Sequence, residues 1–96
     1  MTECVKKISV VYKFEIPLYY DMNGKISRFQ RYIKGCFPDT VFHELCVDQC
    51  SVGAARIHFV FSFKHDSPDS IYVQDLLIRG ADIMRTKKYC FSLQIQ

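Results

Sequence analysis

The segment from Ala55 to Lys64 alternates apolar and polar side chains more strictly than any other part of the chain. Its apolar set consists of Ile57, Phe59, Phe61 and Phe63. Side chains two residues apart point to the same face of a β-strand, so these four form one large apolar face. Such a face must pack under a second layer of structure, because water would otherwise surround its aromatic rings. The segment therefore predicts a strand that lies under helices.

Three more segments alternate in the same way. The first, Val5 to Ile16, is followed by Pro17, and its apolar face comprises Ile8, Val10, Tyr12, Phe14 and Ile16. The last begins at Tyr89, and its apolar face adds Phe91, Leu93 and Ile95. In the segment from Thr40 to Asp48 two faces compete for the inner side. One of these faces carries Val41, His43, Leu45 and Val47, and the other carries Phe42, Glu44, Cys46 and Asp48.

Two segments have helical spacing instead. From about residue 24 to 36, apolar residues recur as Ile26, Phe29, Ile33 and Cys36 or Phe37, and the polar side carries Lys25, Arg28, Arg31 and Lys34. Asn23 is the expected cap, and Pro38 enforces the stop. Ser67, Pro68 and Asp69 are typical of a second helix start, and Lys87 and Lys88 suit its end. The core stripe of this helix is Val73, Leu76, Leu77, Gly80, Ala81 and Met84, whose small residues allow a close approach to the sheet.

The resulting order is β-α-β-β-α-β, which predicts a ferredoxin-like α+β sandwich with a four-stranded antiparallel sheet and both helices on one face. A chain of 96 residues has room for one such domain, spanning residues 1–96. Function does not follow from this fold, because it serves nucleic-acid binders, nucleases, ligand sensors and interaction modules alike.

The net charge and the cysteines limit the classes of partner and the cellular compartments that the sequence allows. A net charge of +3 is well below that of a dedicated duplex binder. The five cysteines are an odd number without regular spacing, unlike secreted disulfide scaffolds, and no segment reads as a signal peptide or a membrane span. We therefore expect a cytoplasmic protein that does not use a membrane.

Several chemical sites are disfavoured by the pattern. An RNA-recognition module stacks bases on aromatic side chains of the open sheet face, but here the aromatic side chains share the covered face. His43, Cys46, Cys50 and His58 have a spacing that imitates a zinc site, yet a regular strand points His43 and Cys46 to opposite faces. No nucleophile or phosphate-loop motif occurs. We expect no metal, no cofactor and no catalytic residues.

The segment Val10–Pro17, followed by a basic helix from Lys25 to Lys34, resembles the start of the small ferredoxin-like metal-dependent nucleases of CRISPR adaptation and the related ribonuclease antitoxins. In that family the first strand ends in an aspartate that holds the metal. Glu15 stands at this place here, without an obvious second carboxylate. The resemblance implies an alternative function, namely RNA or DNA binding or metal-dependent endoribonuclease activity at Glu15.

Two surfaces are left over once the core is assigned. Leu18, Tyr19 and Tyr20 form an apolar loop that cannot all face the core, and adjacent tyrosines are favoured interface anchors. The basic residues Arg28, Arg31 and Lys34 lie beside this loop in the sequence. Ile71 and Ile78 lie on one line of the second helix, away from its core stripe, and are candidates for self-association.

We therefore expect a small non-enzymatic regulator or inhibitor, of the kind that phages and mobile elements encode. It would bind a larger protein or a nucleoprotein complex through Leu18, Tyr19, Tyr20, Arg28, Arg31 and Lys34. The sequence leaves open whether nucleic acid is contacted directly and whether the protein is a monomer or a homodimer.

Overall fold

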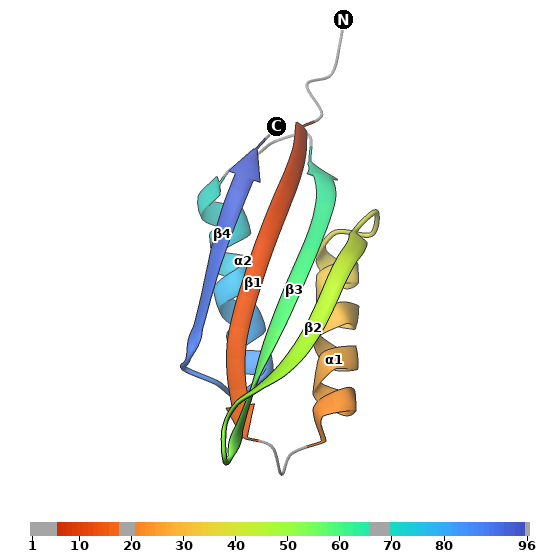
Figure 1. The fold of residues 1–96 in the computed structure, drawn as a ribbon. Helices are drawn as coiled ribbons and strands as arrows, with labels where there is room; N and C mark the ends of the chain where they lie inside the picture. The colour runs from red at the N-terminus through yellow and green to blue at the C-terminus, as the bar shows by residue number, and fades with distance from the viewer. Residues whose placement is uncertain (1–5, 18–20, 66–69, 96) are drawn as a thin grey trace, which may run out of the picture.

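Strands β1 (Lys6–Pro17) and β3 (Ala54–His65) form the centre of an antiparallel four-stranded sheet in the order β2-β3-β1-β4. The edge strands are β2 (Val41–Ser51) and β4 (Tyr89–Ile95). Helices α1 (Met22–Cys36) and α2 (Ser70–Ile83) cover one face, and the other face is open (Figure 1). This computed structural model describes residues 6–17, 21–65 and 70–95. The ferredoxin-like sandwich predicted from the sequence is confirmed.

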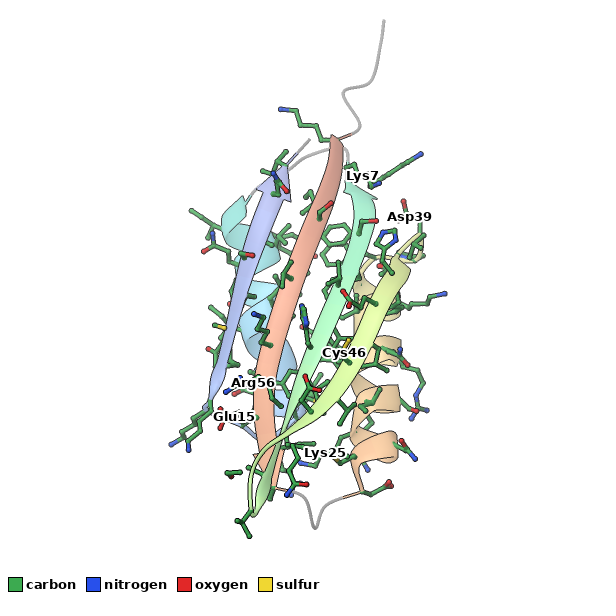
Figure 2. All side chains as sticks on the ribbon, in the orientation of Figure 1. Lys7, Glu15, Lys25, Asp39, Cys46 and Arg56 are labelled. Carbon is green, nitrogen blue, oxygen red and sulfur yellow. The ribbon has the colours of Figure 1, made fainter. Side chains whose placement is uncertain are left out.

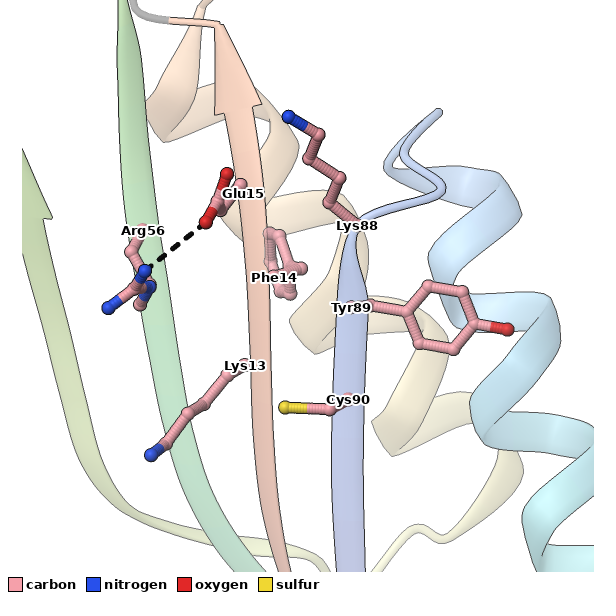
Figure 3. Close-up of a pocket in the computed structure, with 7 residues that line it drawn as sticks. All are labelled: Lys13, Phe14, Glu15, Arg56, Lys88, Tyr89 and Cys90. Carbon is pink, nitrogen blue, oxygen red and sulfur yellow. Dashed lines mark hydrogen bonds and ion pairs between the residues drawn. The ribbon is translucent and has the colours of Figure 1, made fainter. Parts of the chain in front are cut away.

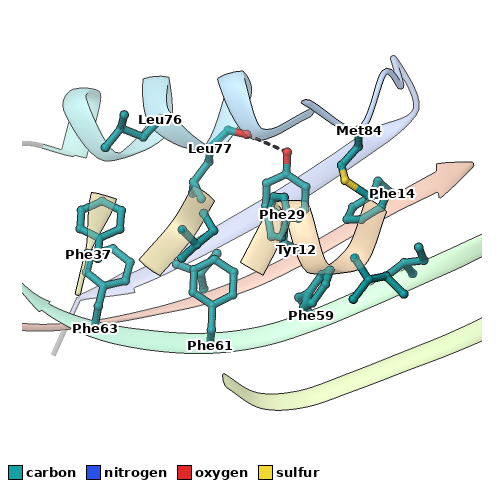
Figure 4. Packing of buried hydrophobic residues seen from close by; sticks show 14 of the residues in the cluster. Tyr12, Phe14, Phe29, Phe37, Phe59, Phe61, Phe63, Leu76, Leu77 and Met84 are labelled. Atoms are coloured by element: carbon teal, nitrogen blue, oxygen red, sulfur yellow. Dashed lines mark hydrogen bonds between the residues drawn. The ribbon is translucent and has the colours of Figure 1, made fainter. Parts of the chain in front are cut away.

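The core lies between the sheet and the two helices, and aromatic rings dominate it (Figure 4). The predicted apolar faces of β1 and β3 and the predicted stripe of α2 are all buried. Phe29 of α1 sits at the centre, with its ring centroid 4.9 Å from that of Phe59 and 5.0 Å from that of Tyr12. Such ring pairs stabilise the fold beyond the free energy gained by burying apolar surface. Phe29 therefore joins α1 to both central strands.

The start of α1 differs from the expected cap. Asp21, not Asn23, is the N-cap, and its Oδ1 accepts a 3.1 Å hydrogen bond from the backbone N–H of Gly24. A Cβ at Gly24 would clash with Oδ2 of Asp21, so glycine leaves room for this cap. Lys25 was expected on the polar side of the helix but is buried, and its Nζ donates a 3.0 Å hydrogen bond to the carbonyl oxygen of Met84.

Helix α2 approaches α1 more closely than its sequence suggests. We expected Gly80 to allow contact with the sheet, but a Cβ there would lie 2.8 Å from Cε1 of Phe29 in α1. The helix ends at Ile83, so Lys87 and Lys88 lie beyond its last turn. Lys25 takes the role expected of them, because its ammonium group meets the negative end of the α2 dipole.

A bulge in strand β2 explains why its sequence alternation left the inner face undecided. Phe42 pairs with Phe61, Glu44 pairs with Val60 and Leu45 pairs with Phe59, so the register shifts at His43. One inserted residue exchanges the faces of all residues beyond it. Neither of the two expected faces is therefore the inner one throughout, because Phe42 before the bulge and Leu45 and Val47 after it share the helix side.

Neither α1 nor the described part of α2 is long and apolar enough to span a membrane.

Candidate functional site

A groove of about 690 Å³ runs between α1 and the edge strand β2. Its lining consists of Ser27, Gln30, Arg31, Lys34, Gly35 and Phe42. Five of these residues belong to α1, and Phe42 is contributed by β2. We call this feature the α1–β2 groove.

Phe42 forms the apolar base of the groove. Its ring lies 5.6 Å from that of Phe61 and 6.1 Å from that of Phe59, so the core holds it in place while one side is left partly exposed. Leu45 and Val47 continue the apolar surface along the same side of β2, and they are 42% and 43% exposed. Leucine and valine side chains at strand positions that face a helix layer are normally covered.

The position of β2 follows from the short connection that precedes it. The backbone N–H of Phe37 donates to Ile33 and closes the last turn of α1, and Thr40 then donates from both its N–H and its Oγ1 to the carbonyl oxygen of Phe37. These bonds begin β2 beside the end of α1. Among the described residues β2 pairs only with β3, so its second side is a sheet edge that can accept another strand.

The two faces of β2 differ in charge. On the helix side, Arg31 and Lys34 are exposed on α1 and line the groove together with Phe42, and none of the described lining residues is a carboxylate. On the open side, Glu44 and Asp48 are placed opposite Val60 and Arg56 of β3. The groove therefore presents positive charge next to an apolar strip, which suits an acidic segment with apolar side chains.

The structure separates the basic residues that we grouped as one surface. Arg31 and Lys34 line the α1–β2 groove, whereas Arg28 lines a different hollow, of about 280 Å³, beside the end of α2. Leu18, Tyr19 and Tyr20 fall outside the described residues, and their role as anchors stays a prediction. Ile71 and Ile78 are 75% and 44% exposed on α2, as the expected self-association line requires.

Sequence reasoning missed Phe42, Leu45 and Val47 as site residues. The sequence did carry a signal, namely the undecided alternation of the second strand. A strand on which two faces compete for the inner side is a strand that buries neither face well. The bulge at His43 could not be read from that pattern.

The open sheet face holds His43, Cys46 and His58 of the suspected zinc pattern, and the side chain of Cys50 lies outside the part of the chain that the structure describes. His43 Nε2 lies 2.6 Å from Oγ of Ser62, which places His43 on the same face as Cys46, so our expectation of opposite faces was wrong. The bulge at His43 is the reason. Among the side chains that the structure describes, which leave out those of Cys50 and His65, no three of His, Cys, Asp or Glu come together to hold a metal ion. The Cys46 thiol donates to Glu44 at 3.3 Å, and this bond raises the pKa of the thiol.

Glu15, the residue of the nuclease resemblance, is bound by an arginine. Its Oε1 accepts a 3.2 Å hydrogen bond from Arg56 in the ion pair shown in Figure 3. Both side chains lie at the edge of a hollow of about 370 Å³ on the open face. The aromatic side chains of β1 and β3 are buried on the other face, as predicted, so within the described strands the open face carries no Phe or Tyr ring on which a base could stack. The rings on the open face are the imidazoles of His43 and His58.

Comparisons with known proteins show the fold and no family. No protein-family model and no curated protein matches the chain. The de novo designed protein Foldit4 is similar with a TM-score of 0.59 and 13% identity, over 94% of this chain and 96% of that one. An amidase of the hydantoinase/carbamoylase family from Burkholderia multivorans gives a TM-score of 0.54 and 14% identity, over 96% of this chain. A second, from Burkholderia ambifaria, gives 0.50 and 9%, also over 96%.

The chain spans 27% of the length of each of these two amidases. At such low identity the likeness concerns the path of the backbone alone.

Proposed function

We propose that the protein is a non-enzymatic docking module that binds a larger protein, or a nucleoprotein complex, as a regulator or inhibitor. The partner contributes an extended segment that adds to the edge of β2 and places acidic side chains against α1. The observation that carries this proposal is the α1–β2 groove, where an uncovered edge strand with Leu45 and Val47 lies beside the cations Arg31 and Lys34.

The energetic argument has two parts. Backbone hydrogen bonds to an exposed strand edge supply affinity that does not depend on sequence, and side chains of alternate residues supply specificity. Covering apolar surface on Leu45 and Val47 contributes roughly 25 cal/mol for each Å² removed from water. The two cations on α1 chiefly raise the association rate and select an acidic partner over a basic one.

The first test uses a defined probe. A synthetic extended peptide that alternates valine with glutamate should shift the backbone amide NMR signals of β2 and of the second half of α1. The matched peptide with lysine in place of glutamate should shift them far less. Shifts spread evenly over the molecule, or equal shifts with both peptides, would remove the basis for this groove.

The second test uses matched variants. Arg31→Glu/Lys34→Glu should weaken peptide binding at least about tenfold at low salt, whereas Lys6→Glu/Lys7→Glu makes the same charge change at the start of β1 and should leave it nearly unchanged. A natural partner recovered from native lysate should likewise be lost with the first variant and kept with the second. Equal recovery with both would contradict the proposal.

A further inference from the structure

One end of the sheet gathers basic side chains around three adjoining hollows of about 370, 320 and 280 Å³. The first and second hollows share Glu15 and Lys88, and the second and third share Arg85. They lie where β1 ends, α1 begins and the connection from α2 enters β4. We call this region the basic end. Figure 2 shows Glu15, Arg56 and Lys25 at this end of the molecule and Lys7 at the opposite end.

Cations outnumber carboxylates in these hollows. The basic lining residues are Lys13, Lys25, Arg28, Arg56, Arg85, Lys87 and Lys88. The acidic lining residues are Glu15 and Asp21, and both are already used. Glu15 pairs with Arg56 at 3.2 Å, and Asp21 caps α1 through Gly24.

Two of the seven cations are also occupied, since Arg56 holds Glu15 and Lys25 holds the Met84 carbonyl oxygen. The other five are Lys13, Arg28, Arg85, Lys87 and Lys88, and none of them forms an ion pair within the described ranges. All five are exposed. Asp48, opposite Arg56 in the sheet register, bounds the basic end on the side of β2.

The cations are close enough to affect one another. The pKa of Lys25 is lowered first by burial and then by the positive charges of Arg85 and Arg28. Like charges placed so near each other raise the local positive potential, and an arriving anion would relieve their repulsion.

The backbone that carries these side chains is firmly held. Arg85 has a φ of 55°, the left-handed conformation that side-chain-bearing residues seldom adopt. It follows the last turn of α2, where the N–H of Thr86 donates to the carbonyl oxygen of Ala81. Oγ1 of Thr86 donates a 2.7 Å hydrogen bond to the carbonyl oxygen of Glu15, and the N–H of Glu15 donates to that of Lys88 at 2.9 Å. The connection is therefore fixed onto the end of β1.

The net charge of the whole chain is only +3, but its cations are concentrated at this end. We propose that the basic end binds the phosphate backbone of a duplex nucleic acid. Cations spread over three adjoining hollows match a ligand with repeated negative charges better than a single small anion. Figure 3 shows Lys13 and Lys88 on either side of the Glu15–Arg56 pair, while the Tyr89 ring points away toward the helices. Tyr89 stacks on Tyr12, with centroids 6.2 Å apart, so it is not presented to a base. Contact through phosphates, without base stacking, suits paired strands and predicts little sequence preference.

The test measures fluorescence anisotropy with a labelled DNA duplex of about 20 base pairs, or two helical turns. Affinity should fall steeply between about 50 and 200 mM salt, by roughly 40-fold if three phosphates are contacted. Lys87→Glu/Lys88→Glu should lose at least about tenfold in affinity and flatten the salt dependence by about two phosphate contacts. Lys13→Glu, in another element, should show a smaller loss of the same kind.

Lys6→Glu/Lys7→Glu is the matched control, because it reverses two adjacent exposed lysines at the far end of β1. It should change duplex affinity less than about twofold beyond the general effect of net charge. Equal losses in the two double variants would overturn the proposal. Tighter binding to vesicles of anionic lipid, or to the single strand of the same sequence, would also overturn it. Arg31→Glu/Lys34→Glu should spare duplex binding, so failure here can be told apart from failure at the α1–β2 groove.

Discussion

The hydroxyl group of Tyr12 in β1 donates a 2.7 Å hydrogen bond to the carbonyl oxygen of Leu77 in α2 (Figure 4). Tyr32 of α1 makes the same contact, also at 2.7 Å, with the carbonyl oxygen of Leu76. Two neighbouring carbonyl groups of α2 are therefore held by tyrosines from a strand and from the other helix. These bonds fix the rotation of α2 about its axis, which apolar packing alone would fix less strictly.

These tyrosines predict a loss of stability at alkaline pH. Burial, then the nearby Cys36, raises the pKa of Tyr32 from 10.0 to about 12, and burial also raises that of Tyr12. A raised folded-state pKa gives a contribution that is complete below pH 10 and is lost as the pH approaches 12. Tyr32→Phe should cost about 1 kcal/mol at pH 8, and its difference from the native protein should shrink toward pH 12. Urea denaturation at several pH values measures this, and a constant difference would contradict it.

The contact between Gly80 and Phe29 predicts opposite effects of two alanine substitutions. Gly80→Ala would place a Cβ 2.8 Å from the Phe29 ring, which Tyr12 and Phe59 hold in position, so we expect a loss of about 1–3 kcal/mol. Gly35→Ala meets nothing within 4 Å and should stabilise α1 by about 0.5–1 kcal/mol. Denaturation midpoints report both, and a stabilising Gly80→Ala would refute the close approach of the helices.

A substitution can remove the hydrogen bond by which Lys25 caps the end of α2 and still keep the packing of its side-chain stem. Lys25→Met keeps an apolar stem but leaves the Met84 carbonyl oxygen without the ammonium group, so unfolding should become easier by about 1–2 kcal/mol. Arg28→Met removes a cation from an exposed position three residues later and should stay within about 0.5 kcal/mol of the native protein. Equal effects of the two substitutions would show that the ammonium–carbonyl bond contributes nothing specific.

The exposed line on α2 predicts a change in self-association. Ile78→Glu should leave the melting temperature within a few degrees, because Ile78 is 44% exposed and the adjacent pair Asp75–Arg79 is already polar. If the protein dimerises through this helix, the variant should sediment as a monomer, since a charge in a desolvated contact costs several kcal/mol. Gln94→Glu adds the same charge on the open face of β4, away from α2, and serves as the control. A dimer that tolerates Ile78→Glu would exclude this face.

Binding through the loop before α1 remains open to a direct test. Tyr19→Ala and Tyr20→Ala, made separately, should include at least one variant that stays folded and loses more than about tenfold in partner affinity. Affinity against the partner recovered with the native protein measures this. If both variants bind normally, the loop is not an anchor, and if both unfold, the two tyrosines belong to the core.

The parts of this fold that follow from local periodicity could be predicted, and the parts that depend on distant partners could not. Alternation in β1 and β3 and helical spacing in α2 identified the buried residues, because every second or every third to fourth side chain meets the same layer. Lys25 escaped prediction because its partner carbonyl lies 59 positions away, at the end of the other helix. Arg28 and Arg31 are three residues apart in the sequence, but Arg28 lines the hollow beside the end of α2 and Arg31 lines the α1–β2 groove. This separation depends on where α2 and β2 pack, which the local spacing of the residues does not show.

The register shifts in β2, at His43 and again between Gln49 and Ser51, set a limit on what the exposed edge can accept. The longest regular stretch of β2 is Glu44 to Gln49, between the two shifts, so an incoming strand can stay in register for a few residues and is then interrupted at both ends. The two register shifts thus limit the length of the strand that can pair with this edge. We therefore expect the edge to capture a short strand and to be a poor template for an indefinitely growing sheet.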